Sequence, residues 1–139
     1  MGRNIVIPAS KAVDGNKDGG INDSCIMTQN ADFNPWWQVD LEWMYDITSV
    51  TISNRYDQTA SDKLLVDVSV MVYDKDPFDS SDPSVVTAPS KLCTFLPGFF
   101  GRTVRTFECD QKTVGRYIRI TKPTEYLSLC EVEVTGIQQ

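Results

Sequence analysis

The sequence predicts an all-β domain, built as an antiparallel β-sandwich. Short runs of β-branched and aromatic residues recur along the chain, as strands require. No stretch keeps the apolar spacing of a helix for about 10 residues, and the connections are rich in Asp, Ser, Gly and Pro. For a chain of 139 residues without an internal repeat, we expect a single domain over residues 1–139.

Six segments carry the strand pattern. In residues 49–53 and 117–121 the apolar side chains fall on every second residue, which predicts strands with one buried face and one face in solvent. In chain order, we expect strands at residues 37–41, 47–54, 64–73, 102–109, 117–121 and 130–136. The adjacent Trp36 and Trp37 should point to opposite faces, so at most one can stack on a ligand and at least one belongs to the core.

Two long polar connections interrupt the strands. Residues 14–33 are polar and contain glycines, and residues 74–90 contain Pro77, Pro83 and Pro89. We interpret residues 74–90 as an exposed loop rather than a linker between domains. Long loops on a β scaffold are where binding residues usually lie.

The charge balance limits the classes of partner. With 13 basic and 19 acidic residues, a net charge of −6 and a pI near 4.5, the chain is unsuited to nucleic acid or an anionic membrane. No apolar run reaches the roughly 18 residues of a membrane-spanning helix. A cation such as calcium suits this surface better.

Four cysteines indicate disulfides and an extracellular location. They have no CxxC spacing, and the chain has no histidine to complete a mixed zinc site. Three pairings are possible, of which Cys93 with Cys109 and Cys25 with Cys130 is a plausible set. The alternative is four buried thiols in a cytosolic protein.

The residue types argue against an enzyme. Histidine, the commonest general base, is absent, and no cysteine is spare for nucleophilic attack. A glycosidase would need two carboxylates about 5 to 9 Å apart, which the sequence alone does not set. We therefore expect a binding module without catalysis.

Two polar segments are candidates for binding. Residues 14–20 offer hard oxygen donors beside glycines, as calcium requires, although on the residues alone a solvated Asx turn is the stronger interpretation. Arg55, Asp57 and Lys63 follow an expected strand, and Arg and Lys donate to sugar hydroxyls while Asp orients the arginine. An exposed ion-pair cluster explains these three charges equally well.

Five blocks of sequence resemble one family over nearly the whole chain. They cover residues 10–16, 34–41, 50–55, 114–118 and 125–134, including the Pro35-Trp36-Trp37 run. In these blocks the chain resembles the F-type lectins, the fucose-binding lectins of fish and invertebrates. The resemblance implies a discoidin-like antiparallel β-sandwich, of the jelly-roll kind, with long binding loops at one end.

The resemblance also implies a calcium ion that ties the opening loops to the closing strand, and the disulfides Cys25–Cys130 and Cys93–Cys109. The implied calcium ligands are the Lys11 carbonyl, Asp14, the Asn16 carbonyl, Ser24, the Cys130 carbonyl and Glu131. This implication reverses the interpretation of residues 14–20 as a solvated turn.

The sugar site departs from the family pattern. Arg55 and Asp57 match it, whereas Lys63 falls one residue late and Met27 stands where the family has a histidine. A thioether cannot donate to a sugar hydroxyl. Many members carry an adjacent cysteine pair where this chain has residues 58–61, and the opening loop after Pro8 is short.

We therefore expect a calcium-stabilised, non-catalytic lectin module with an altered fucose-type site. Its expected partners are a fucosylated or other glycan, or a cell-surface glycoprotein, and weak multivalent binding favours a homo-oligomer. The alternative is a protein-binding or adhesion module, as in the invertebrate sperm adhesion protein bindin, that keeps the fold, the calcium and the disulfides but no longer reads sugars. Neither interpretation includes nucleic acid or membrane insertion.

Overall fold

The structure, a computed structural model, is nearly all-β, as the sequence predicts. It describes residues 26–28, 33–54, 65–79, 81–83, 90–100, 104–124 and 127–139. Its strands in these residues are β1 (Ile26–Met27), β2 (Trp36–Ser53), β3 (Val66–Tyr73), β4 (Ser90–Phe99), β5 (Val104–Glu108), β6 (Val114–Thr121), β7 (Ser128–Leu129) and β8 (Glu131–Gln138). No helix in this part of the chain is long and apolar enough to span a membrane.

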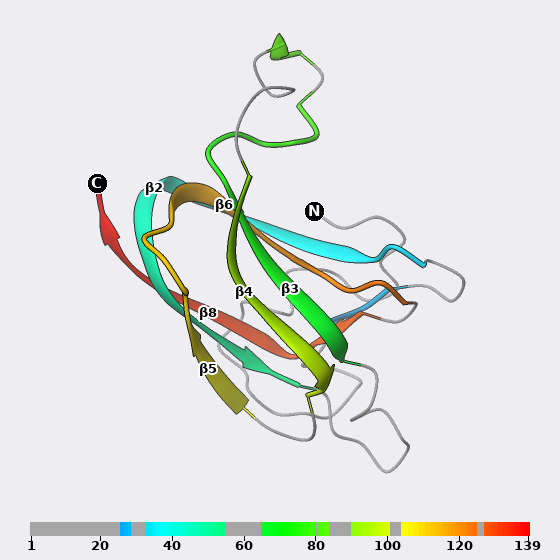
Figure 1. Cartoon of the computed structure of the whole chain (residues 1–139). Coiled ribbons are helices and arrows are strands. Elements are labelled where there is room, and N and C mark those ends of the chain that lie inside the picture. Colours follow the sequence, from blue (N-terminus) through cyan, green and yellow to red (C-terminus); the bar gives the residue numbers. More distant parts are fainter. Residues whose placement is uncertain are drawn as a thin grey trace.

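Strand β2 joins two layers of antiparallel sheet. Its first half pairs with β6, from Trp36 opposite Thr121 to Asp46 opposite Val114. Its second half pairs with β5 on one side and β8 on the other. Figure 1 shows β2 curving between the layers, so that β4, β3 and β6 continue one layer while β5 and β8 flank the strand in the other.

The bend in β2 coincides with an irregularity in its pairing. The register with β6 shifts between Asp40 and Tyr45, and Glu42 has a φ of 67° in the left-handed region. An irregular strand twists more strongly than a regular one, which lets the chain turn without ending the strand. For this reason the expected strands 37–41 and 47–54 are two halves of one strand.

The core lies between the layers and follows the alternation in the sequence. Val50 and Ile52 of β2 are fully buried, and Ile118 and Ile120 of β6 face them from the other layer. The two alternating segments therefore bury the faces that their spacing predicts. Trp37 is 1% exposed and belongs to the same core.

Strand β4 and the two-residue strands β1 and β7 are missing from the sequence prediction. Strand β4 lies at one edge of the six-stranded sheet, and its register with β3 shifts twice. Each shift breaks the period of two, and Pro97 resembles a turn residue although an edge strand tolerates proline.

The outer face of the first layer carries a stack of aromatic rings around one arginine. Arg119 lies 4.2 Å from the ring centre of Phe78 and 4.6 Å from that of Trp36, and those two rings stack at 4.7 Å. Arg119 Nε and Nη2 also donate to Gln38 Oε1. Burial lowers the pKa of Arg119. The stack holds Phe78, from the connection after β3, on the sheet, and it confirms that Trp36 and Trp37 face opposite ways.

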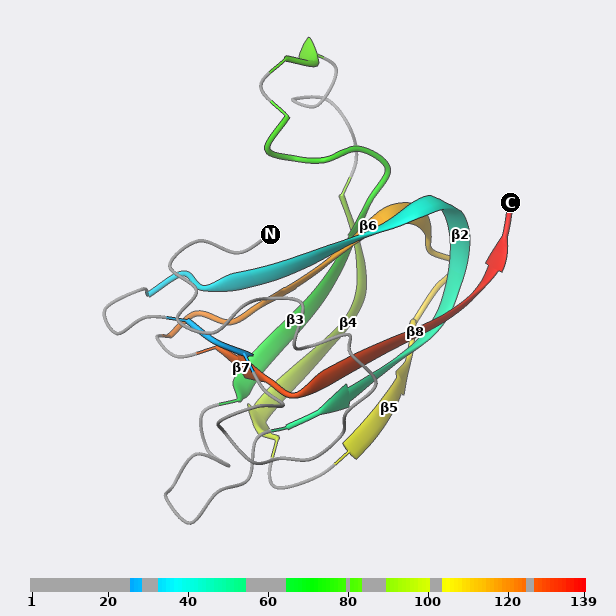
Figure 2. The ribbon, with the colours of Figure 1, turned by 180° about the vertical axis from the view of Figure 1, so that it is seen from behind.

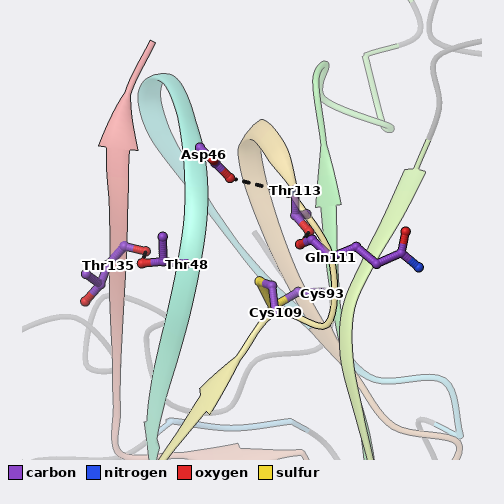
Figure 3. Close-up of a disulfide and its surroundings, with 7 residues drawn as sticks. All are labelled: Asp46, Thr48, Cys93, Cys109, Gln111, Thr113 and Thr135. Carbon is purple, nitrogen blue, oxygen red and sulfur yellow. Dashed lines mark hydrogen bonds between the residues drawn. A yellow bond between two sulfur atoms is a disulfide. The ribbon is translucent and has the colours of Figure 1, made fainter.

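A disulfide connects the edges of the two layers. Cys93 of β4 is bonded to Cys109, directly after β5, which confirms the short pairing (Figure 3). Cys109 N donates to Thr48 O, so the same cysteine is also tied to β2. Cys130 is disulfide-bonded as well, and its implied partner Cys25 lies outside the described residues.

We predict that Gly115→Ala destabilises the protein, because β3 and β6 approach closely there. A Cβ at Gly115 would overlap Val72 Cγ1 and come within 3.0 Å of Tyr73 O. Overpacking of this kind costs about 1–3 kcal/mol of unfolding free energy. Thermal unfolding should show a lower Tm than for Lys112→Ala, a change at an exposed position. Equal melting temperatures for the two variants would contradict the close approach.

Candidate functional site

The structure describes part of the predicted binding site. Cys130 and Glu131 lie in the described residues, as does the backbone of Met27. The other predicted calcium ligands and sugar-binding residues lie outside them, namely Lys11, Asp14, Asn16, Ser24, Arg55, Asp57 and Lys63. The described residues nevertheless form the frame from which these segments leave.

The short sheet of β1 and β7 fixes the position of Met27. Met27 is paired with Ser128. Figure 2 shows β1 and β7 side by side, next to the start of β8. Thr28 is fully buried and bonds Leu127 twice, through Thr28 N to Leu127 O and through Leu127 N to Thr28 Oγ1, both at 3.0 Å. The backbone of Met27 is thereby held close to Cys130 and Glu131.

The end of β2 meets the start of β8 at the same place. Ser53, the last residue of β2, is in register with Glu131. Cys130 N donates to Ser53 O at 3.0 Å. The chain therefore leaves β2 toward Arg55 from a point beside Glu131. Three segments that are far apart in the sequence, around residues 27, 53 and 130, meet at one end of the sandwich.

Most of the buried polar residues in the described part of the chain lie at this end of the sandwich. Five of the nine buried polar or charged residues in the described part of the chain lie here: Thr28, Ser53, Asn54, Ser128 and Glu131. The Glu131 side chain is 3% exposed. A buried carboxylate is costly unless cations or hydrogen-bond donors compensate it. Such a cluster is a feature of a binding site rather than of a core built for stability alone.

The chemistry of this cluster fits a hard cation. Calcium takes carboxylate, carbonyl and hydroxyl oxygens, and Glu131 and the Cys130 carbonyl supply the first two kinds. The hydroxyls of Ser53 and Ser128 are buried and have no hydrogen-bond partner among the described atoms. Buried polar atoms normally have a hydrogen-bond partner. We therefore expect these two hydroxyls to have polar neighbours beyond the described residues. The described residues contain no group of three or more His, Cys, Asp or Glu that could hold a metal by themselves.

Sequence reasoning missed the residues that build this frame. Thr28, Ser53 and Ser128 read as ordinary polar strand residues, because the sequence does not show that three short segments converge. Their positions in the sequence could have indicated this role. Ser53 and Asn54 directly precede Arg55, and Ser128 precedes the Cys130–Glu131 pair.

Comparison with protein families and curated relatives gives consistent matches. A family model described as NedA-like, galactose-binding domain, of the F5/8 type C group, matches residues 11–120. Fucolectin-4 of Anguilla japonica is 36% identical over 135 residues, which cover 93% of this chain and 67% of that protein. The fucolectin of Anguilla anguilla is 34% identical over 91% of this chain and 75% of its own length. Fucolectin-1 of Anguilla japonica, 36% identical, is covered over 66% of its length, so the chain spans about two thirds of these Anguilla japonica relatives.

Solved structures agree with these matches. The f-lectin (fucolectin) from the serum of Morone saxatilis, the striped bass, has a TM-score of 0.76 and 30% identity, over 94% of this chain and 42% of that one. A fucose binding module of Streptococcus pneumoniae has a TM-score of 0.71 and 26% identity, over 99% of this chain and 89% of that one. Because the fold and more than a third of the residues are shared with fucolectins across nine tenths of the chain, the chain belongs to the fucolectin family, the F-type lectins.

Proposed function

We propose that the chain is a non-catalytic lectin module that binds fucosylated or related glycans at the end of the sandwich where β1, β2, β7 and β8 meet. The observation that carries the proposal is the convergence of Met27, the exit of β2 toward Arg55, and Glu131 at that end. The relatives support the class of ligand, because they are fucolectins and a fucose binding module.

Each proposed sugar-binding residue has a separate role. Arg55 and Lys63 donate hydrogen bonds to sugar hydroxyls, and Asp57 orients the guanidinium of Arg55. Met27 packs against an apolar sugar face or a methyl group, because its flexible thioether adapts to irregular surfaces. A site that has lost one donor in this way should differ from the usual fucose site in specificity.

We further propose that calcium stabilises this end of the module. The Glu131 carboxylate and the Cys130 carbonyl would hold the ion together with the Lys11 and Asn16 carbonyls, Asp14 and Ser24. The burial of the Glu131 carboxylate, an oxygen ligand of the kind that calcium takes, supports this set. An ion that joins segments more than 100 residues apart, from Lys11 to Glu131, stabilises the folded state alone.

An extracellular location and glycoprotein partners complete the proposal. The Cys93–Cys109 disulfide is typical of secreted proteins. The striped bass relative is a serum protein. Few polar contacts to one sugar imply weak single-site binding, so a homo-oligomer on a cell surface would bind through several sites at once.

We predict that Arg55→Ala strongly weakens glycan binding. Loss of a charged hydrogen-bond donor should weaken affinity by about 10- to 100-fold. The measurement is a glycan array in calcium that includes fucosylated and non-fucosylated glycans. Arg116→Ala is the matched control, since Arg116 bonds Asp40 at 2.6 and 2.8 Å near the bend of β2. Unchanged affinity for glycans in Arg55→Ala, or silence across the array from folded protein, would overturn the proposed site. Silence would favour the adhesion module.

We predict that chelation lowers the melting temperature and that Glu131→Gln removes most of this difference. Calcium at about 100 times its Kd should add about 3 kcal/mol to the free energy of unfolding. Glu133→Gln is the control, since Glu133 lies on the same strand with its side chain exposed. Melting temperatures should be compared in calcium and in EDTA. A melting temperature that EDTA does not change would contradict the proposed calcium site.

A further inference from the structure

A groove of about 450 Å³ lies on the outer face of the first layer, at the end of the sandwich where β2 and β3 begin and β6 ends. Residues of β3, β4 and β6 line it, and the segments before β2 and after β6 close its rim. Ser69 of β3 stands between Phe95 of β4 and Thr121 of β6, and is in register with both. These three side chains form one row across the sheet, on the face opposite the buried Val70 and Ile120.

The row has the shape of a shallow trough. Ser69 and Thr121 are small, so they leave a hollow beside the much larger ring of Phe95. Trp36 continues the row, in register with Thr121, and is itself covered by Phe78 and Arg119. The Phe95 ring is instead 47% exposed. An exposed aromatic ring can stack on the C–H face of a sugar, and hydroxyl groups beside it can form hydrogen bonds with the sugar's hydroxyls.

A fixed acceptor lies at the same groove. Asp67 Oδ1 accepts a hydrogen bond from Gly98 N at 2.7 Å, which holds the carboxylate in place. A carboxylate has about four lone-pair sites, so one bond leaves further acceptor capacity. Asp67 has a φ of 50° and lies at the register shift between Val66 and Val68, so its left-handed backbone belongs to an irregularity of β3.

The groove has charged residues of both signs. Asp67 and the buried Lys122 both line it, so no single sign of charge there favours a charged ligand. Its volume lies within the roughly 300 to 1,000 Å³ of small-molecule sites. Asn34 and Pro123 complete the lining with an amide and a further apolar surface.

We propose that this groove is a second carbohydrate-binding site, which takes one neutral pyranoside with its apolar face on Phe95 and its hydroxyls toward Ser69, Thr121 and Asp67. The site goes beyond the proposed lectin site and does not depend on it, since none of the described residues that line the groove belongs to the proposed lectin site. Two sites on one chain would allow a branched glycan to be held at both, with an affinity above that of either site alone.

The test is a protein-observed NMR titration with methyl α-L-fucoside, methyl β-D-galactoside and methyl β-D-glucoside, each added separately. At least one should shift the amide signals of Ser69, Phe95 and Thr121 saturably, and Phe95→Ala should raise that Kd by about tenfold. Leu92→Ala is the matched control, because Leu92 is 49% exposed on the same strand and outside the groove. If Phe95→Ala unfolds the protein, Ser69→Tyr is the second variant. Its larger side chain, of a type that strands favour, fills the hollow and should also raise the Kd.

The outcomes separate the two sites. Arg55→Ala should leave the groove signals unchanged, so a failed lectin site and a failed groove give different spectra. The proposal is overturned if none of the three sugars shifts the groove signals saturably. It is also overturned if saturable shifts persist with unchanged Kd in both Phe95→Ala and Ser69→Tyr.

Discussion

The pairing of one long strand with three others is the constraint on which the rest of the structure depends. Strand β2 pairs with β6 in its first half and with β5 and β8 in its second. Because its hydrogen bonds are divided between the two layers, the layers cannot separate without breaking β2. The same strand ends at Ser53, in register with Glu131, so the framework of the sandwich also sets where the binding end begins.

Hydrogen bonds hold that end of the sandwich rigidly, although its buried polar residues disfavour stability. Thr28, Ser53, Ser128 and Glu131 are all buried where apolar side chains would pack at lower cost. The backbone compensates through specific bonds, such as Cys130 N to Ser53 O, and through the two bonds between Thr28 and Leu127. Natural proteins accept such local costs at functional sites, where preorganised polar groups and loops are needed.

The sequence contains enough information for the fold but not for the whole site. Alternation at residues 49–53 and 117–121 identifies the inner faces correctly, because burial enforces the period of two. Bulges erase that period, which explains both the division of β2 and the absence of β4 from the prediction. The Cys93–Cys109 bond is confirmed, whereas the roles of Arg55, Asp57 and Lys63 stay predictions. The convergence of Met27, Ser53 and Glu131 depends on pairing between distant segments, which no local pattern encodes.

The central claim is that glycan binding takes place at the end framed by β1, β2, β7 and β8. A crystal structure grown with calcium and methyl α-L-fucoside, or the best glycan from an array, tests it most directly. We expect density for the sugar against Arg55 and Asp57, and an ion at Glu131. A bound sugar with no contact to that end, and no ion at Glu131, would contradict it.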